Sequence, residues 1–273
     1  MCNFTSKTIN MISKQSPQSS FKEIIIKDST PILKLDTNLH NHSFQISITS
    51  KKIARFFFSI ILILLFGSLF GILLKYYWNI NSAVFAIIYR FFDFNSEANI
   101  PTFFSSALLL FASLILFFIK TAVANKNKYW YFLSALFLFL CVDEAAQIHE
   151  NFDKLKSRIP VLTESILSHV WVLPYIILVV LLGVFLKNFL FSLPSKTRNL
   201  MILSGIVYVC GAIGLEIIEG QLYVSSNHGS STLVLDLLYC IEEVCEMSGT
   251  TIFIYALLDY IAPKNSPISI RAN

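Results

Sequence analysis

The sequence predicts an all-α protein: a polytopic membrane helix bundle of about six transmembrane helices, preceded by a disordered N-terminal tail. Three observations support this fold class. Hydrophobic residues make up 55% of the 273 residues, charged residues only 14%, and the mean hydropathy is +0.65, which is too apolar for a soluble domain of this size. The apolar residues are gathered in long runs, and Lys and Arg are concentrated in the connections on one side of these runs.

The chain divides into a tail, a membrane domain and a second, short tail. Residues 1–52 are rich in Ser, Asn, Thr, Lys and Gln. Their short apolar stretches bury too little surface to offset the chain entropy, so we expect a disordered cytoplasmic tail. Residues 53–263 form the expected six-helix transmembrane domain, and residues 264–273 form a cytoplasmic C-terminal tail.

The first apolar run, Phe56 to Leu74, has 19 residues without a charge. At about 1.5 Å per residue it crosses roughly 30 Å of hydrocarbon. The stretch from Ala83 to Phe94 is too short and too charged to cross, and we expect an interfacial helix there. The six expected spans cover about residues 56–74, 102–119, 129–148, 168–186, 200–218 and 233–261.

The distribution of positive charge predicts the orientation. Sixteen of the 21 Lys and Arg residues fall before the first span, in the C-terminal tail and in the loops after the second and fourth spans, and five fall on the other side. Positively charged loops stay in the cytoplasm, so both termini are expected to be cytoplasmic in a multi-pass protein of the cell membrane. The net charge of +4 is therefore a topology signal, with the lipid bilayer as partner and no nucleic acid.

Ionisable side chains inside membrane spans are rare and usually face a cavity, a partner or a bound ion. This chain has many of them, in three spans: Asp143, Glu144, His149 and Glu150 at the end of the third, Glu216 and Glu219 at the end of the fifth, and Asp236, Glu242, Glu243 and Glu246 in the sixth. The third and fifth spans run outward and the sixth runs inward. These groups should therefore meet at one depth, near the non-cytoplasmic face, where His169 and His228 also fall.

So many carboxylates cannot all stay ionised in a low dielectric, because repulsion and lost hydration both penalise the charged forms. No Lys or Arg lies in these three spans at the required depth, which leaves protons or a metal ion to neutralise them. Glutamates with one to three histidines are typical ligands of iron, manganese and some zinc sites between helices. The chain lacks Glu-x-x-His and His-Glu-x-x-His, so no established metal motif is matched.

The leading hypothesis is a membrane-embedded metal site for a divalent ion, Zn, Fe or Mn. Such a site could serve a hydrolase or oxidoreductase that acts on a lipid or small amphipathic substrate. The expected metal ligands are Asp143, His149, Glu150, Glu216, Glu219, Glu242 and Glu246. In the hydrolase version the metal activates a water, and Glu144 and Glu243 are the expected catalytic acid-base residues.

Two other classes of protein fit the same residues. The carboxylates could bind and release a proton or cation in a coupled transporter, although the sequence shows no internal repeat or broken helix of the kind many transporters have. They could also form a polar network that fixes helix register in a sensor or scaffold without catalysis. The sequence alone does not decide whether the protein is an enzyme.

The segment Asp143 to Glu150, with Glu216 and the Glu242-Glu243-x-x-Glu246-x-x-Gly249 pattern downstream, resembles a known group of sequences. These are uncharacterised bacterial multi-pass membrane proteins with an Asp-Glu-Ala-x-x-x-His-Glu signature, and the resemblance covers roughly the third to the sixth span. It implies that these polar residues belong together, and it implies no activity.

Overall fold

A computed structural model of the chain describes residues 46–78, 83–122, 128–148, 172–225, 232–262 and 268–270. Most of the expected N-terminal tail, most of the C-terminal tail and the candidates His149, Glu150, His169 and His228 lie outside these residues. Two three-residue strands, β1 (Ile46–Ile48) and β2 (Ile268–Ile270), pair antiparallel with Ile46 opposite Ile270. The other regular elements that the structure describes are helices.

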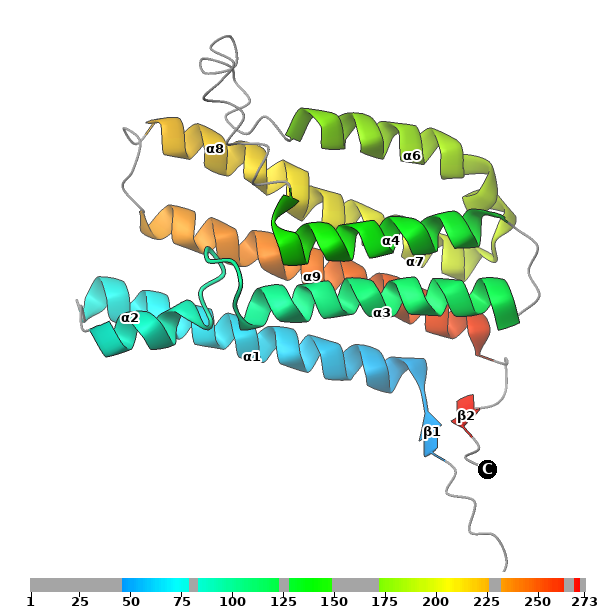
Figure 1. Cartoon of the computed structure of the whole chain (residues 1–273), viewed down its shortest axis with the longest axis horizontal. Coiled ribbons are helices and arrows are strands. Elements are labelled where there is room, and N and C mark those ends of the chain that lie inside the picture. The colour runs from blue at the N-terminus through cyan, green and yellow to red at the C-terminus, as the bar shows by residue number, and fades with distance from the viewer. Residues whose placement is uncertain are drawn as a thin grey trace, which may run out of the picture. The chain divides into compact units, whose positions relative to one another are not determined.

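Six helical stretches are long and apolar enough to cross a membrane, which confirms the predicted all-α, six-span class (Figure 1). The fifth stretch is one continuous run built from α7, the π-helix η2 and α8, while α2 has only eight residues and is no span. The protein is therefore a multi-pass membrane protein. The helices are α1 (Ser50–Tyr77), α2 (Ala83–Arg90), α3 (Ile100–Ala122), α4 (Lys128–Ala146), α6 (Val172–Ser192), α7 (Ser195–Val209), η2 (Cys210–Leu215), α8 (Glu216–Ser225) and α9 (Leu233–Ile261).

Local sequence explains where several helices begin. Asn99 accepts a hydrogen bond from the backbone N–H of Thr102 at 3.1 Å and so caps α3, and Pro101 sits in the first turn, where its missing N–H costs nothing. Pro194 separates α6 from α7. Thr232 caps α9 by accepting from the N–H of Leu235 at 3.3 Å.

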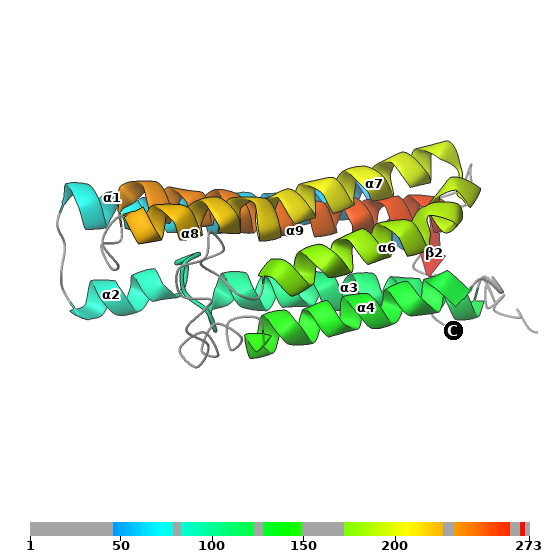
Figure 2. The same cartoon turned by 90° about the horizontal axis from the view of Figure 1, so that it is seen from above.

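The last helix, α9, is the centre of the bundle. It packs against α1, α3, α7 and η2, and α3 packs in turn against α4 (Figure 2). Half of its most apolar window is buried inside the protein, against 11% for α6. Lipid is as apolar as a leucine side chain, so close packing of α9 with its neighbours, and not the hydrophobic effect, holds these helices together.

Glycines allow close helix approach at four points. A Cβ at Gly249 of α9 would lie 2.8 Å from the backbone nitrogen of Tyr208, and one at Gly211 of η2 would lie 2.9 Å from the carbonyl oxygen of Glu242. In α1, Gly67 and Gly71 instead receive the rings of Phe92 and Tyr89. The first two contacts bring the backbones of the fifth and sixth spans together.

We predict that Gly249→Ala destabilises the bundle by about 1–3 kcal/mol, because the added methyl group meets backbone that cannot move without separating α7 from α9. Gly205→Ala in α7 is the control, since a Cβ there meets nothing within 4 Å. Unfolding in a titration from mild detergent to SDS measures both variants. Equal midpoints for Gly249→Ala and the unmodified protein would contradict the proposed contact.

Candidate functional site

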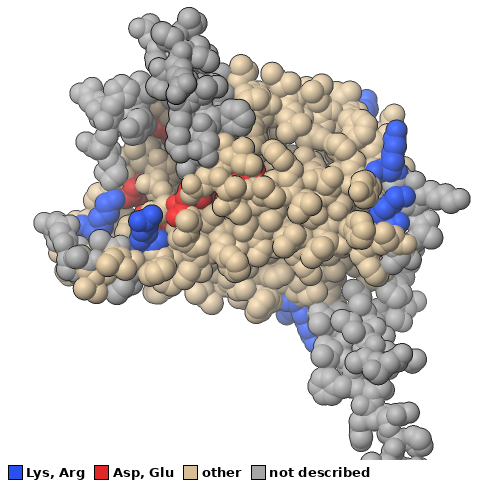
Figure 3. Space-filling model, viewed as in Figure 1, with Lys and Arg blue, Asp and Glu red and all other residues tan. Residues whose placement is uncertain are grey.

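Among the described residues, the acidic side chains other than Asp259 gather at one end of the bundle, called here the acidic end, where α1 ends and α8 and the first half of α9 lie. Figure 3 shows acidic side chains grouped toward this end, with Lys and Arg beside them, and a broad surface without charge before the basic residues of the other end. This surface is the expected lipid-facing belt. The side of the membrane on which the acidic end lies stays a prediction.

Three carboxylates from two helices form the tightest group. One oxygen each of Glu216 and Glu219 of α8 and Glu242 of α9 lie within 4.8 Å of one another, close enough to hold one metal ion. Glu216 and Glu219 are three residues apart and share a face of α8. Glu219 is only 2% exposed. These three residues, called the glutamate triad below, are three of the seven predicted metal ligands.

The π-helix η2 ends directly before Glu216 and packs on α9. A π turn takes about one residue more than an α turn, so it changes the direction in which the following residues point. Gly211, pressed against the Glu242 carbonyl, lets this segment come close to α9. Sequence reasoning missed the segment, and the glycines of Cys-Gly-Ala-Ile-Gly-Leu were its only signal.

A second acidic group lies on a neighbouring face of α9. Glu243 interacts electrostatically with Glu144 of α4, with Glu246 of α9 and with Glu97, and more weakly with Glu219 of the triad. Its Oε2 atom is buried and has no hydrogen-bond partner among the described residues. The two predicted catalytic residues, Glu144 and Glu243, therefore lie in one group, while Glu242 turns toward α8.

Glu97 is the member of this group that sequence reasoning missed, because it lies in a turn before α3 and outside every predicted span. The turn is fixed by its own hydrogen bonds. Asp93 accepts from the Tyr89 hydroxyl at 3.1 Å and from Ser96 Oγ at 2.9 Å, and Asn99 Nδ2 donates to the Asp93 carbonyl at 2.6 Å. Burial, together with the charge of Asp93, raises the pKa of Tyr89, so this hydroxyl remains a donor at neutral pH.

Asp143, another predicted metal ligand, contacts α6. Its side chain is buried, and its Oδ2 accepts a hydrogen bond of 2.5 Å from the Tyr175 hydroxyl of α6. The helix α4 ends at Ala146, and Gln147 has a left-handed backbone with φ of 55°. The helix that carries Asp143 and Glu144 therefore ends before the ligand candidates His149 and Glu150, which lie outside the described residues.

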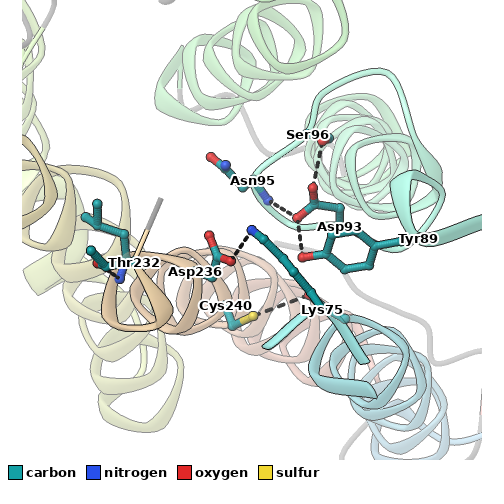
Figure 4. A network of polar contacts seen from close by, with 10 residues as sticks. Lys75, Tyr89, Asp93, Asn95, Ser96, Thr232, Asp236 and Cys240 are labelled. Carbon is teal, nitrogen blue, oxygen red and sulfur yellow. Dashed lines mark hydrogen bonds and ion pairs between the residues drawn. The ribbon is translucent and has the colours of Figure 1, made fainter. Parts of the chain in front are cut away.

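Asp236 of α9 is neutralised by Lys75, at the end of the first span. Their side chains lie 2.7 Å apart, and that of Asp236 is 3% exposed (Figure 4). The sequence argument looked for Lys and Arg only in the third, fifth and sixth spans, and therefore expected only protons or a metal ion to neutralise the buried carboxylates. That expectation was wrong for Asp236, because Lys75 of the first span neutralises it. Ser68 of α1 and Cys240 of α9 contact each other at 3.4 Å, deeper in the bundle. Together with the pair of Lys75 and Asp236 they form a set of polar contacts between α1 and α9, called here the polar joint.

The fold and the site define a six-span membrane protein with a carboxylate group packed between its fifth and sixth spans. The chain belongs to the family described as Domain of unknown function (DUF8692), whose model matches residues 54–261 and so includes the glutamate triad and Lys75. Comparisons with curated proteins and with solved structures give no match.

We predict that Lys75→Met destabilises the protein by about 2–4 kcal/mol, somewhat less than for a fully buried pair because the Lys75 side chain is 35% exposed. The loss arises because the charge of Asp236 stays buried without its cation. The double variant Lys75→Met with Asp236→Leu should recover most of the stability. Unfolding midpoints in detergent measure all of these variants.

Lys196→Met is the matched control. Lys196 pairs with Asp259 at 2.7 Å at the other end of α9, but the two side chains are 60% and 26% exposed, so its loss should cost less than about 1 kcal/mol. If Lys75→Met costs no more than this control, the pair with Asp236 contributes nothing to the joint between α1 and α9.

Proposed function

We propose that this protein is a membrane-embedded metalloprotein, which binds a divalent cation with the glutamate triad and uses it in chemistry on a lipid-like substrate. The observation that carries the proposal is the distance among the three carboxylates, within 4.8 Å, in a partly buried place between two spans. Two like charges about 4 Å apart repel by about 4 kcal/mol at an effective dielectric constant near 20. A divalent cation among them replaces this repulsion with attraction.

The ligand atoms favour one kind of metal. Carboxylate oxygens suit Mg²⁺, Ca²⁺ and Mn²⁺, whereas imidazole suits Zn²⁺ and iron. Of the three metals expected from the sequence, the all-oxygen triad is best matched by Mn²⁺. A contribution from His149, which lies outside the described residues, would move the preference toward iron or zinc.

The second acidic group gives the proposal its catalytic part. A bound divalent cation supplies Lewis-acid activation of a water or substrate oxygen. Glu243 follows Glu242 in α9 and carries a buried carboxylate oxygen without a hydrogen-bond partner among the described residues, which suits a group that accepts a proton during reaction. Glu144 interacts electrostatically with Glu243, and in this proposal the two carboxyl groups share that proton.

Cation transport is the second candidate, and η2 is the observation that favours it. Segments of π-helix within a span are frequent at functional sites, and η2 changes the helical geometry of the continuous fifth span directly before Glu216. In this version the triad holds the transported ion for a limited time. A non-catalytic sensor or scaffold would need neither a bound metal nor a flux.

We predict that the purified full-length protein binds Mn²⁺ stoichiometrically after exposure to the ion and desalting, as measured by elemental analysis. Glu219→Gln and Glu242→Gln should each abolish this binding, because a neutral amide replaces one of three ligands. Mn²⁺ at 100 times its dissociation constant should also stabilise the protein by about 2.7 kcal/mol, seen as a higher unfolding temperature.

Asp259→Asn is the control, since it removes one carboxylate of α9 far from the triad and should leave the metal content unchanged. A folded protein that takes up no Mn²⁺, Fe²⁺ or Zn²⁺ and unfolds at the same temperature with and without them would contradict the metal site and favour the scaffold. Uptake of Mn²⁺ into proteoliposomes, lost in Glu219→Gln, would favour the transporter over the enzyme.

A further inference from the structure

An apolar cavity of about 590 Å³ lies between α4, α6, α7 with η2, and α9. Its wall is almost entirely hydrocarbon, and none of the residues that line it is charged. Representative lining residues are Leu136 and Leu140 of α4, Leu178, Leu182 and Leu186 of α6, and Phe253 of α9.

Contacts between α4 and α6 bound the cavity at its two ends. At one end, rings of α4 and α6 pack together: Tyr129 and Phe185 have ring centroids 5.0 Å apart, and Trp130 and Phe189 are also at 5.0 Å. At the other end the Tyr175 hydroxyl donates to Asp143 at 2.5 Å. Between these contacts α6 stands apart from the bundle, consistent with the small buried share of this helix.

The length of the cavity matches a lipid chain. Its lining on α6 runs from Tyr175 to Leu190, which at about 1.5 Å per residue is roughly 22 Å along the helix axis. The cavity is partly open to the surface, so a chain of the surrounding lipid can enter it and give the lining dispersion contacts that an empty space would lack. Water is a poor occupant, because it needs two to four polar partners and the wall offers few.

The cavity also has a polar end. Tyr175 and Tyr208 both line it, and both face the acidic end, where Tyr175 holds Asp143 and Tyr208 interacts with Glu246 and Glu144. The opposite end is lined by residues such as Leu190 and Met201. A lipid chain in the cavity would therefore place its head group beside carboxylates, which are complementary to an amine or a hydroxyl group.

We propose that this cavity binds one hydrocarbon chain of a membrane lipid whose head carries an amine or hydroxyl group, with the head at the acidic end. The evidence for this lipid-chain site is the cavity and the contacts at its two ends. Only the role of this lipid as substrate rests on the proposed metal function.

The test uses a phosphatidylethanolamine with a photoreactive diazirine in one acyl chain, incorporated in nanodiscs with the full-length protein. Peptide mapping after illumination should place the label on cavity residues of α4, α6 and α7. Gly205→Phe should lower this labelling about tenfold, equivalent to ~1.4 kcal/mol of binding. Gly205 lines the cavity and a Cβ there meets nothing within 4 Å, so a ring fits only by filling the space.

Gly183→Phe is the matched control, because Gly183 of α6 is also open to a Cβ but does not line the cavity. A second pair covers a failure of Gly205→Phe to fold: Leu182→Phe fills the cavity from the opposite wall, and Leu181→Phe adds the same ring to a neighbouring lipid-facing position. Label spread evenly over the lipid-facing surface, and unchanged in both cavity-filling variants, would overturn the proposal.

Two further measurements separate this inference from the metal site. Glu219→Gln and Glu242→Gln should lose the metal and keep the cavity label. If the unmodified protein takes up no metal but is still labelled specifically at the cavity, the metal function is refuted and the lipid-chain site still stands. In metal-depleted protein, a phosphatidic acid probe with the same chain should label less than the phosphatidylethanolamine, because its anionic head meets Asp143 and Glu246. Stronger labelling by phosphatidic acid would overturn the head-group assignment.

Discussion

The close contact between the fifth span and α9 is the constraint on which the rest of the acidic end depends. Gly249 and Gly211 let the two backbones approach so closely that a methyl group at either position would meet main-chain atoms at 2.8 or 2.9 Å. This contact places Glu216 and Glu219 opposite Glu242. Three carboxylates would not come together by their own interactions, because they repel, so the packing energy of the helices must hold them there. The cation proposed above would therefore meet a set of ligands that the helix packing has already assembled.

The six-span architecture could be predicted from the sequence because a bilayer imposes a simple length rule on apolar runs. Phe56 to Leu74 lies inside α1, and the run at 233–261 coincides with α9. The ends were less predictable, since helices continue past the apolar run where capping and packing allow it: α1 extends to Ser50 and Tyr77. The π-helix could not be predicted, because its wider turns have no sequence period and depend on contact with α9.

The site could be predicted only in part, because the sequence does not show which side chains on different helices contact each other. Depth along each span placed the acidic residues at one end, and the three-residue spacing of Glu216 and Glu219 predicted a shared face. Neither argument shows which helix faces which. The contact of Asp143 with the hydroxyl of Tyr175 on α6 could therefore not be predicted, and its role as a metal ligand stays a prediction. Lys75 was counted only as a topology signal, although it neutralises Asp236 across the bundle, and Glu97 was not considered because it lies in a turn.

The segment η2 is the structural link between the acidic groups and the apolar cavity. One face of it, at Gly211, touches α9 beside Glu242 and Glu246, while Cys210 and Ile213 line the cavity. The segment therefore directly precedes Glu216 of the triad and also forms part of the cavity wall. Irregular helical segments change conformation at lower cost than regular ones, because their hydrogen bonds are less favourable. A conformational link between the proposed ion site and the proposed lipid site would therefore run through this one segment of six residues.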